Sequence, residues 1–537
     1  MSKTASFWLV AAITAVVASP AAAQDADRDK ARALIAQVMN GGQVVTAPPA
    51  SLQPTGPTVE LTSEQAVARA LDKNLTLASQ RITPETWDLQ IASYLANYKP
   101  NLTSQYSTQN AVQLNTNLFA GGNRVTQDTN AWSGGLAQNV WWGGGNYTVN
   151  WTNSRLASDA TNSTVNPSYT SGLQAIYTQP LLRNFKMDNN RLQVQTAKLS
   201  QDSAELTLKA TTASTVAQVR SAYWELVYAR QAVEAAQASL DLASKLVADN
   251  RSRVEIGTMA PIDVVQAQAD EATRRQTLVN AEATLRNDEL ALKRLIVSGT
   301  DDELWRATIV PTDLPTAAPQ NVDLEGAVQI ALQQRTDLAT TRKNLELADV
   351  QLRNLNNLTL PQLDLIGTYT LNGRGGTALQ RDPQNPVNII NTIPGGYVDA
   401  LAGIGTFDAP TWNARLQFAL PLGVSAPKAN LARQRLLRRQ TEADVKAAEL
   451  TIATDVTTAA LAIRNSLEAM QAATAARELS VKRLEAAQSK FEVGMSNNFE
   501  VLQAQRDLAD ARNRELRETL NYQRALVDFE RAQISPR

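Results

Sequence analysis

The sequence predicts a mainly α-helical fold that also carries a membrane β-structure. Two runs of about 60 residues, 188–256 and 429–493, contain neither glycine nor proline and are rich in residues that favour helices. Between such runs the hydrophobic period changes from 3.6 residues to two, as it does where helices give way to strands. The same order of sequence landmarks occurs twice along the chain, which indicates one architecture built from two repeats.

The repeats are recognised from ordered matches. Val254-Glu255-Ile256-Gly257 recurs as Phe491-Glu492-Val493-Gly494, and the similarity continues without a gap from 262–268 to 499–505. Further matches pair 66–71 with 327–332, 99–102 with 360–363, and 179–181 with 420–422. We therefore expect a first repeat over 59–300 and a second over 322–537. The Pro-bearing segment 301–321 is expected to be a linker, with Asp301, Asp302 and Glu303 solvated.

The N-terminal residues have the pattern of a secretory signal peptide. Lys3 precedes an apolar stretch from Phe7 to Ala18, and small residues follow at 21–23. We expect a signal peptide over 1–23 and an N-terminal extension over 24–58. The alternative is an anchor helix, but the apolar stretch is short for one. After it no stretch approaches 18 apolar residues, so any entry into a membrane would have to use β-strands.

Composition excludes several classes of function. The chain has no histidine and no cysteine, which removes His-dependent and thiol catalysis and the usual zinc ligands. Its net charge of −1 gives no reason to expect nucleic acid as the partner, because a nucleic-acid-binding protein would show a basic face. No spacing of carboxylates or lysines indicates an enzyme, and we expect no catalytic residue, cofactor or metal. A periplasmic coiled-coil or adaptor protein that forms no channel stays open as an alternative function for this chain.

The helical parts are expected over 188–298 and 429–534. In each, a helix of roughly 90–100 Å ends at a glycine, Gly257 or Gly494, and a second helix runs back. Runs this long favour coiled-coil packing. The apolar positions are rich in alanine, as in 232–240, and small side chains would let the helices approach closely.

The strands are expected within 100–182 and within 361–422. Apolar and polar residues alternate over 363–371 and 412–420, and less clearly over 101–107 and 169–180; this is the apolar-out, polar-in pattern of outer-membrane strands. An additional hairpin is indicated by 132–142 and 147–151, which flank Gly143-Gly144-Gly145. It could be a surface excursion, and we favour two spanning strands per repeat with this hairpin as an elaboration of the first.

Four or six strands cannot close a barrel, and open strand edges are not tolerated in lipid because every backbone N–H and C=O there needs a partner. The chain is therefore expected to oligomerise, with each copy contributing strands to a shared barrel and helices to a tube beneath it. This reasoning does not fix the number of copies.

The doubled helix–strand–strand–helix plan, the strand-ending Gln179-Pro180-Leu181-Leu182 and the glycine tips resemble the TolC-like outer membrane efflux protein family. The resemblance covers nearly the whole chain from about residue 59. It implies a homotrimeric channel-tunnel, with a long coiled-coil α-helical barrel in the periplasm and a shared 12-stranded β-barrel in the outer-membrane lipid. Such a duct exports small molecules or proteins with a periplasmic adaptor and an inner-membrane pump of the RND, ABC or MFS class. Without a cysteine, this chain resembles the unlipidated branch.

The resemblance also suggests functional residues. Gly257, Thr258, Gly494 and Met495 at the helix tips would dock the adaptor. Glu500, Gln503 and Asp263 would lie at the periplasmic entrance, where Glu500 would form a ring of three carboxylates. Two simpler readings stay open: Glu500 in a capping box with Asn497, and Asp263 as a carboxylate favoured by the helix dipole. The family's partners for Asp263 align with Ser496 and Phe491, which cannot form the same bonds.

Overall fold

A computed structural model describes residues 57–114, 124–313, 322–385, 387–423 and 425–535. The expected signal peptide, most of the N-terminal extension and residues 314–321 of the expected linker lie outside the described residues. Thr58–Arg537 form one unit. Its helices are α2 Ser63–Lys73, α3 Leu75–Ala96, α4 Asn189–Glu255, α5 Pro261–Ile296, α6 Glu303–Arg306, α7 Leu324–Gln334, α8 Thr336–Leu358, α9 Tyr397–Gly405, α10 Ala426–Glu492 and α11 Asn498–Ala532.

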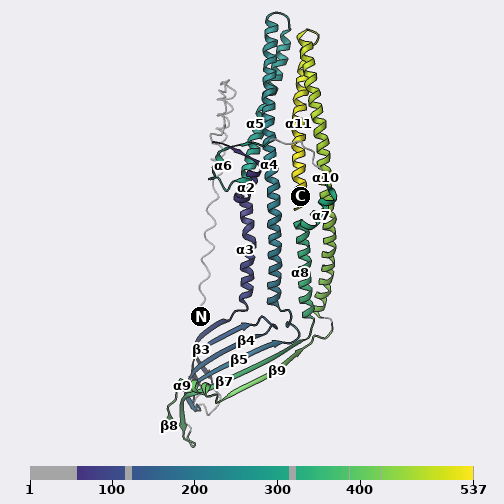
Figure 1. The fold of residues 1–537 in the computed structure, drawn as a ribbon. Helices are drawn as coiled ribbons and strands as arrows, with labels where there is room; N and C mark the ends of the chain where they lie inside the picture. The colour runs from purple at the N-terminus through teal and green to yellow at the C-terminus, as the bar shows by residue number, and fades with distance from the viewer. Residues whose placement is uncertain (1–56, 115–123, 314–321, 386, 424, 536–537) are drawn as a thin grey trace, which may run out of the picture. The chain divides into compact units, whose positions relative to one another are not determined.

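The two longest helices, α4 and α10, have 67 residues each, which corresponds to about 100 Å at 1.5 Å per residue. Each packs along the helix that follows it, so that α4–α5 and α10–α11 form two long hairpins (Figure 1). All four helices begin and end within a few residues of the ranges expected from sequence. Among the described residues, no helix is both long and apolar enough to cross a membrane.

Two layers of four helices continue one another along the long axis of α4 and α10. Near the strands, α3 packs on α4, α4 on α8, and α8 on α10. Towards the hairpin tips, α11 packs against α4 and completes the order α5, α4, α11, α10 (Figure 1). The coiled-coil core of this second layer includes Leu246, Leu484, Leu502 and Leu508. The duplicated sequence therefore gives two similar helical units side by side.

A small packed region lies where the two layers meet. Strand β1 Thr58–Leu61 pairs in parallel with β6 Thr308–Pro311, and Tyr223, Leu226 and Leu292 are buried beneath them. In the second repeat Leu338, Ile452 and Val456 form the corresponding core. Next to it the buried guanidinium of Arg335 pairs with Asp337 and Asp455, at 2.7 and 3.1 Å.

The expectation of a solvated acidic linker was wrong at Asp302. Its side chain is 5% exposed and its carboxylate lies 2.5 Å from Nη2 of Arg69. It also accepts a hydrogen bond from the backbone N–H of Leu304, which caps α6. A carboxylate can be buried when it is both paired and hydrogen-bonded, and pairing across 233 residues of sequence leaves no local signal.

One antiparallel sheet holds seven strands of the described residues, in the order β2-β3-β4-β5-β7 with β9 and β8 on the far edge of β7. Figure 1 shows these strands side by side at the end of the unit remote from the hairpin tips. The ranges are β2 Asn101–Leu114, β3 Arg124–Asn139, β4 Asn146–Ser158, β5 Val165–Pro180, β7 Gln362–Arg381, β8 Ile389–Ile393 and β9 Pro410–Ala419.

The additional hairpin of the first repeat is present as β3 and β4. We had favoured two spanning strands per repeat, with this hairpin as an elaboration of the first repeat; in the structure the hairpin is part of the sheet itself. It lies between β2 and β5 and pairs with both along most of its length. The order of strands in a sheet depends on which strand edges pair, often across long stretches of sequence. The alternation of apolar and polar residues within one strand does not predict that order.

Candidate functional site at the hairpin tips

The two hairpin tips have the same backbone geometry. After α4, Gly257 has a φ of +78°, and the backbone N–H of Thr258 donates to the carbonyl of Arg253 at 2.9 Å. After α10, Gly494 has a φ of +76°, and the N–H of Met495 donates to the carbonyl of Lys490 at 2.8 Å. This is the Schellman ending, in which a left-handed residue closes the helix. Both positions therefore need a left-handed backbone conformation, which glycine adopts without steric cost.

Large apolar side chains surround both glycines and face solvent. At the first tip Ile256 is 74% and Ile262 is 60% exposed. At the second tip Val493 is 71%, Met495 79% and Phe499 64% exposed. Ile256 corresponds to Val493 in the repeat, and Ile262 to Phe499. Exposed apolar clusters of this kind mark interaction surfaces.

Sequence reasoning identified the glycines and their neighbours Thr258 and Met495, but it missed Ile256, Ile262, Val493 and Phe499. The signal was present, because large apolar residues flank the glycine at equivalent positions of both repeats. We name the residues Ile256, Ile262, Val493, Met495 and Phe499 together the apolar tips.

Glu500 lies in the first turn of α11, next to the second tip. The side chain of Asn497 accepts the backbone N–H of Glu500 at 3.0 Å, so Asn497 caps the helix as the simpler reading required. In the described part of the chain, the Glu500 carboxylate makes no reciprocal bond to the backbone N–H of Asn497. It accepts a hydrogen bond from the Ser496 hydroxyl at 2.5 Å. The ammonium group of Lys490 lies 3.8 Å away.

The other two entrance candidates, Gln503 and Asp263, make their hydrogen bonds to residues other than Glu500. Gln503 donates to Asp507 one turn further along α11, at 2.8 Å. Asp263 is in the first turn of α5, where a carboxylate is favoured by the helix dipole, and its backbone carbonyl accepts the Asn498 amide at 3.5 Å. Ser496 bonds to Glu500, so it is not engaged by Asp263.

Three contacts that sequence reasoning missed tie the two hairpins together. The amides of Asn250 on α4 and Asn498 on α11 are both buried and hydrogen-bonded at 3.0 Å. The Asp270 carboxylate, 3% exposed, lies 2.9 Å from Nε of Arg506 on α11. These polar groups occupy positions that coiled-coil reasoning assigns to apolar residues.

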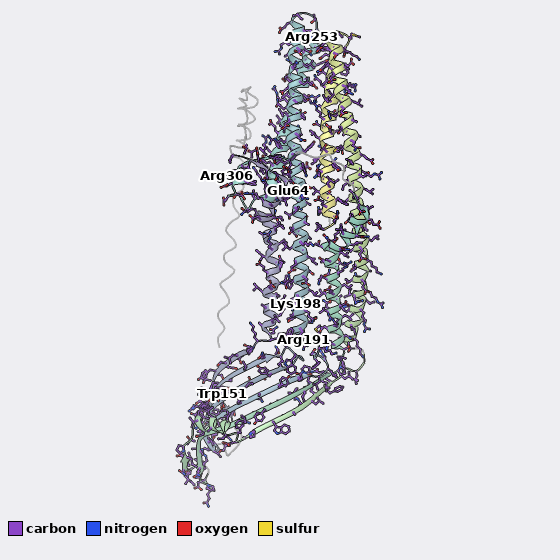
Figure 2. All side chains as sticks on the ribbon, in the orientation of Figure 1. Glu64, Trp151, Arg191, Lys198, Arg253 and Arg306 are labelled. Atoms are coloured by element: carbon purple, nitrogen blue, oxygen red, sulfur yellow. The ribbon has the colours of Figure 1, made fainter. Side chains whose placement is uncertain are left out.

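The third tie is a cation–π contact. The guanidinium carbon of Arg253 lies 4.4 Å from the centre of the Phe491 ring, within the range of an attractive interaction. Figure 2 shows Arg253 at the tip end of the helices, opposite Trp151 on the sheet. Phe491 therefore has a cationic partner from the other hairpin, although it lacks a hydroxyl.

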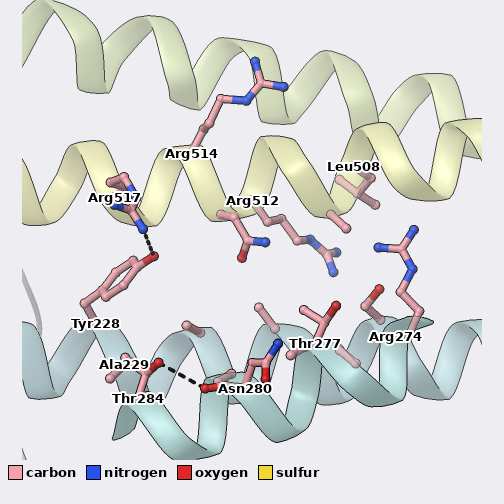
Figure 3. Close-up of a pocket in the computed structure, with 18 of the residues that line it drawn as sticks. Tyr228, Ala229, Arg274, Thr277, Asn280, Thr284, Leu508, Arg512, Arg514 and Arg517 are labelled. Carbon is pink, nitrogen blue, oxygen red and sulfur yellow. Dashed lines mark hydrogen bonds between the residues drawn. The ribbon is translucent and has the colours of Figure 1, made fainter. Parts of the chain in front are cut away.

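A cavity of about 390 Å³ lies between α4, α5 and α11 (Figure 3). Alanines of α4 line one side, including Ala232, Ala235 and Ala236. Figure 3 shows Arg274 and Arg512 extending into this space. We expected the alanine-rich run to bring the helices close together; at this point the small side chains leave a hollow between α4 and the helices that face it.

The described residues contain no group of three acidic side chains placed to hold a metal ion. Near the tips, Arg253, Asp270 and Arg506 take part in ties between the two hairpins. The site therefore consists of the exposed apolar tips and the contacts that pack the two hairpins together.

Comparison with known proteins agrees with this geometry. The family model for outer membrane efflux proteins matches residues 146–297 and 327–532, one range in each repeat. The chain belongs to the outer membrane efflux protein family. TolC of Vibrio cholerae serotype O1 is 24% identical over 319 residues, which cover 59% of this chain and 67% of that TolC.

Solved structures with the same fold include a membrane protein from Pseudomonas aeruginosa, with a TM-score of 0.64 and 17% identity over 88% of this chain and 90% of that one. CusC has a TM-score of 0.63 and 14% identity over 88% and 92%. The Campylobacter jejuni outer membrane channel CmeC has a TM-score of 0.63 and 16% identity over 88% and 85%. This member of the efflux family is thus an outer-membrane channel whose helices form a periplasmic tunnel, and it is not an enzyme.

Proposed function

We propose that this efflux channel is a homotrimer that serves as the exit duct of a tripartite efflux pump or a type I secretion system. The apolar tips are the observation that supports the proposal. They end two helices of about 100 Å that start at the sheet, so they lie at the periplasmic end of a chain whose strands are in the outer membrane. The partner they fit is a periplasmic adaptor, which connects the duct to an inner-membrane pump.

The apolar tips suit this partner because both repeats present them. Three copies would place six similar tips in a ring, and each tip offers two or three exposed apolar side chains. An adaptor with apolar side chains at its own helix ends would bury them on docking, at about 25 cal/mol for each Å² of apolar surface removed from water.

Photo-crosslinking from the tips tests this proposal. A benzoylphenylalanine at Met495 should capture a protein that mass spectrometry identifies as a periplasmic adaptor of an RND, ABC or MFS system, and its identity would name the pump class. The same probe at Val279, an exposed apolar position on the shaft of α5, is the control. Equal capture from both positions, or capture of the adaptor only from Val279, would refute docking at the tips.

A second element of the proposal concerns the entrance. In a trimer Glu500 would place three carboxylates around one axis, and charged rings of this kind select cations. Its exposure and its place beside the second tip favour this role, and its bonds to Ser496 leave the carboxylate at the surface. Gln503 keeps the size but not the charge of an acid, so the ring would be single.

A further inference from the structure

The sheet has two unpaired edges. Strand β2 pairs only with β3, and β9 pairs only with β7, within the part of the chain that the structure describes. Thirteen of the fourteen residues of β2 and all ten of β9 are exposed. In lipid each unpaired backbone N–H or C=O costs several kcal/mol, so both edges need a partner strand.

A second copy of this chain fits both edges. Along the path β2-β3-β4-β5-β7-β9 every neighbouring pair is antiparallel. Because the path has six strands, β9 of one copy runs antiparallel to β2 of the next, and the alternation continues around a closed ring. Both edge strands also join helices at the same end of the sheet, β2 after α3 and β9 before α10.

Near the helix-side end of the sheet, an apolar row and a polar row each cross all six strands. One row of paired residues is apolar throughout: Leu102, Leu136, Val149, Ala175, Tyr369 and Trp412. The adjacent row on the opposite face is polar or glycine: Thr103, Gly135, Asn150, Gln174, Thr370 and Thr411. On the helix-side part of β3 and β4 the apolar side carries Leu136, Val149 and Trp151, as it does on the neighbouring strands, and a hairpin lying in water would not need this. Further along, the same side carries Asn130 and Arg155, and Tyr397 of α9 packs on it against Trp132.

The register gives the tilt of the strands. The row that starts at Asn101, the first residue of β2, reaches Asn413 on β9, six residues before the helix-side end of that strand at Ala419. Six residues at about 3.3 Å, over five strand spacings of about 4.8 Å, correspond to a tilt of about 40°. This lies within the range of roughly 35–45° for membrane barrels.

The width of the helical layer agrees with six strands per chain. A strand tilted by about 40° occupies about 6.3 Å of circumference, so six strands cover about 38 Å and four cover about 25 Å. The four helices next to the sheet, α3, α4, α8 and α10, cover roughly 36–40 Å at 9–10 Å each. At this tilt, six strands span about the same width as the four helices from which they start.

We propose that each chain contributes all six of these strands to the shared barrel, so that three copies form an eighteen-stranded ring of about 36 Å diameter, closed by pairing of β9 with β2 of the next copy. The inference rests on the proposed trimer. It replaces the twelve strands expected by resemblance, because β3 and β4 are part of the barrel wall.

Cysteine labelling tests whether β4 is part of the wall. The chain has no cysteine, so single substitutions report without background. In reconstituted vesicles, Asn150→Cys should react with a membrane-impermeant maleimide at least tenfold faster than Val149→Cys. Thr370→Cys and Tyr369→Cys lie on β7 in the same two rows and should give the same ratio, which makes them the matched controls.

The outcomes separate the two proposals. One outcome is that the two β7 variants differ in labelling rate as expected while the two β4 variants react with the maleimide at equal rates. This outcome overturns the eighteen-stranded wall but leaves the channel in place. If the two β7 variants also react at equal rates, the membrane wall and the proposed duct are both refuted. A tenfold difference in labelling rate within both pairs supports six strands per chain.

Disulfide crosslinking tests the closure. Aligning the helix-side ends of β2 and β9 brings Gln417 of one copy next to Thr103 of another, with Gln105 one pleat away on the same face. Gln417→Cys combined with Thr103→Cys or Gln105→Cys should give ladders that end at three chains. Gln417→Cys with Gln113→Cys, at the other end of β2, is the control and should stay monomeric. Absence of crosslinks at both Thr103 and Gln105 would overturn the pairing, and ladders that end at another number would overturn eighteen strands.

Discussion

Replacing Gly494 tests the backbone requirement at the second tip. The residue has a φ of +76°, where a branched side chain is strained and asparagine is tolerated. An ideal Cβ added there meets no atom within 4 Å. Any loss of stability therefore comes from the backbone conformation alone, without a steric contribution from neighbours.

The expected cost for Gly494→Val is about 1–2 kcal/mol. For Gly494→Asn it is a few tenths of a kcal/mol, because asparagine visits the left-handed region readily. Since about 1.4 kcal/mol is a factor of ten in an equilibrium constant, local opening of the tip should become roughly five to thirty times more frequent with valine. With asparagine the change should stay below about threefold.

Hydrogen exchange of the tip amides measures this opening. The N–H of Met495, which donates to Lys490, should exchange faster in the valine variant by the factor given above, while amides at the α10–α7 contact should not change. Equal acceleration by asparagine and valine would show that the left-handed conformation is not what glycine provides here, and the reasoning would be wrong.

Three further predictions concern charged groups. Glu500→Gln should move the reversal potential of single channels in a salt gradient towards zero and relieve block by multivalent cations; no change in either would make the side chain a surface residue of the helix only. Asp270→Asn removes the charge that pairs with Arg506 and Arg274 and should weaken the packing of α5 on α11 by about 1–2 kcal/mol, less than for a fully buried pair because Arg506 is half-exposed. Faster hydrogen exchange of the α5 amides around position 270 checks it, and unchanged exchange would contradict it. Burial raises the pKa of Asp302, but hydrogen bonds from the backbone N–H groups of Leu304 and Ser298 and the charge of Arg69 outweigh it and hold that pKa below its usual value. The ion pair should therefore stabilise the fold above the usual carboxyl pKa of about 4, and its contribution should disappear as the pH falls through the lowered value. Acid unfolding followed by circular dichroism should show the protein and Asp302→Asn converging at low pH, and a difference that grows on acidification would contradict the assignment.

The sequence by itself determined the local architecture. Helix length, the turn at each glycine and the alternation of β7 and β9 depend on residues within one or two turns or pleats of each other, so their patterns can be read along the chain. The repeat added long-range information, because it showed that Gly257 and Gly494 occupy equivalent places. The capping role of Asn497 followed for the same local reason.

Only the tertiary structure decided which edges and which charged groups meet. The order β2-β3-β4-β5-β7 places the hairpin inside the sheet, and the pattern of β3 and β4 is the same whether they lie inside it or at its edge. Asp302 pairs with Arg69, and Asp270 pairs with Arg506; the partners in each pair are more than 200 residues apart in sequence. Such pairs depend on how whole helices pack, since a charge is stable in a buried position only when its partner is brought there.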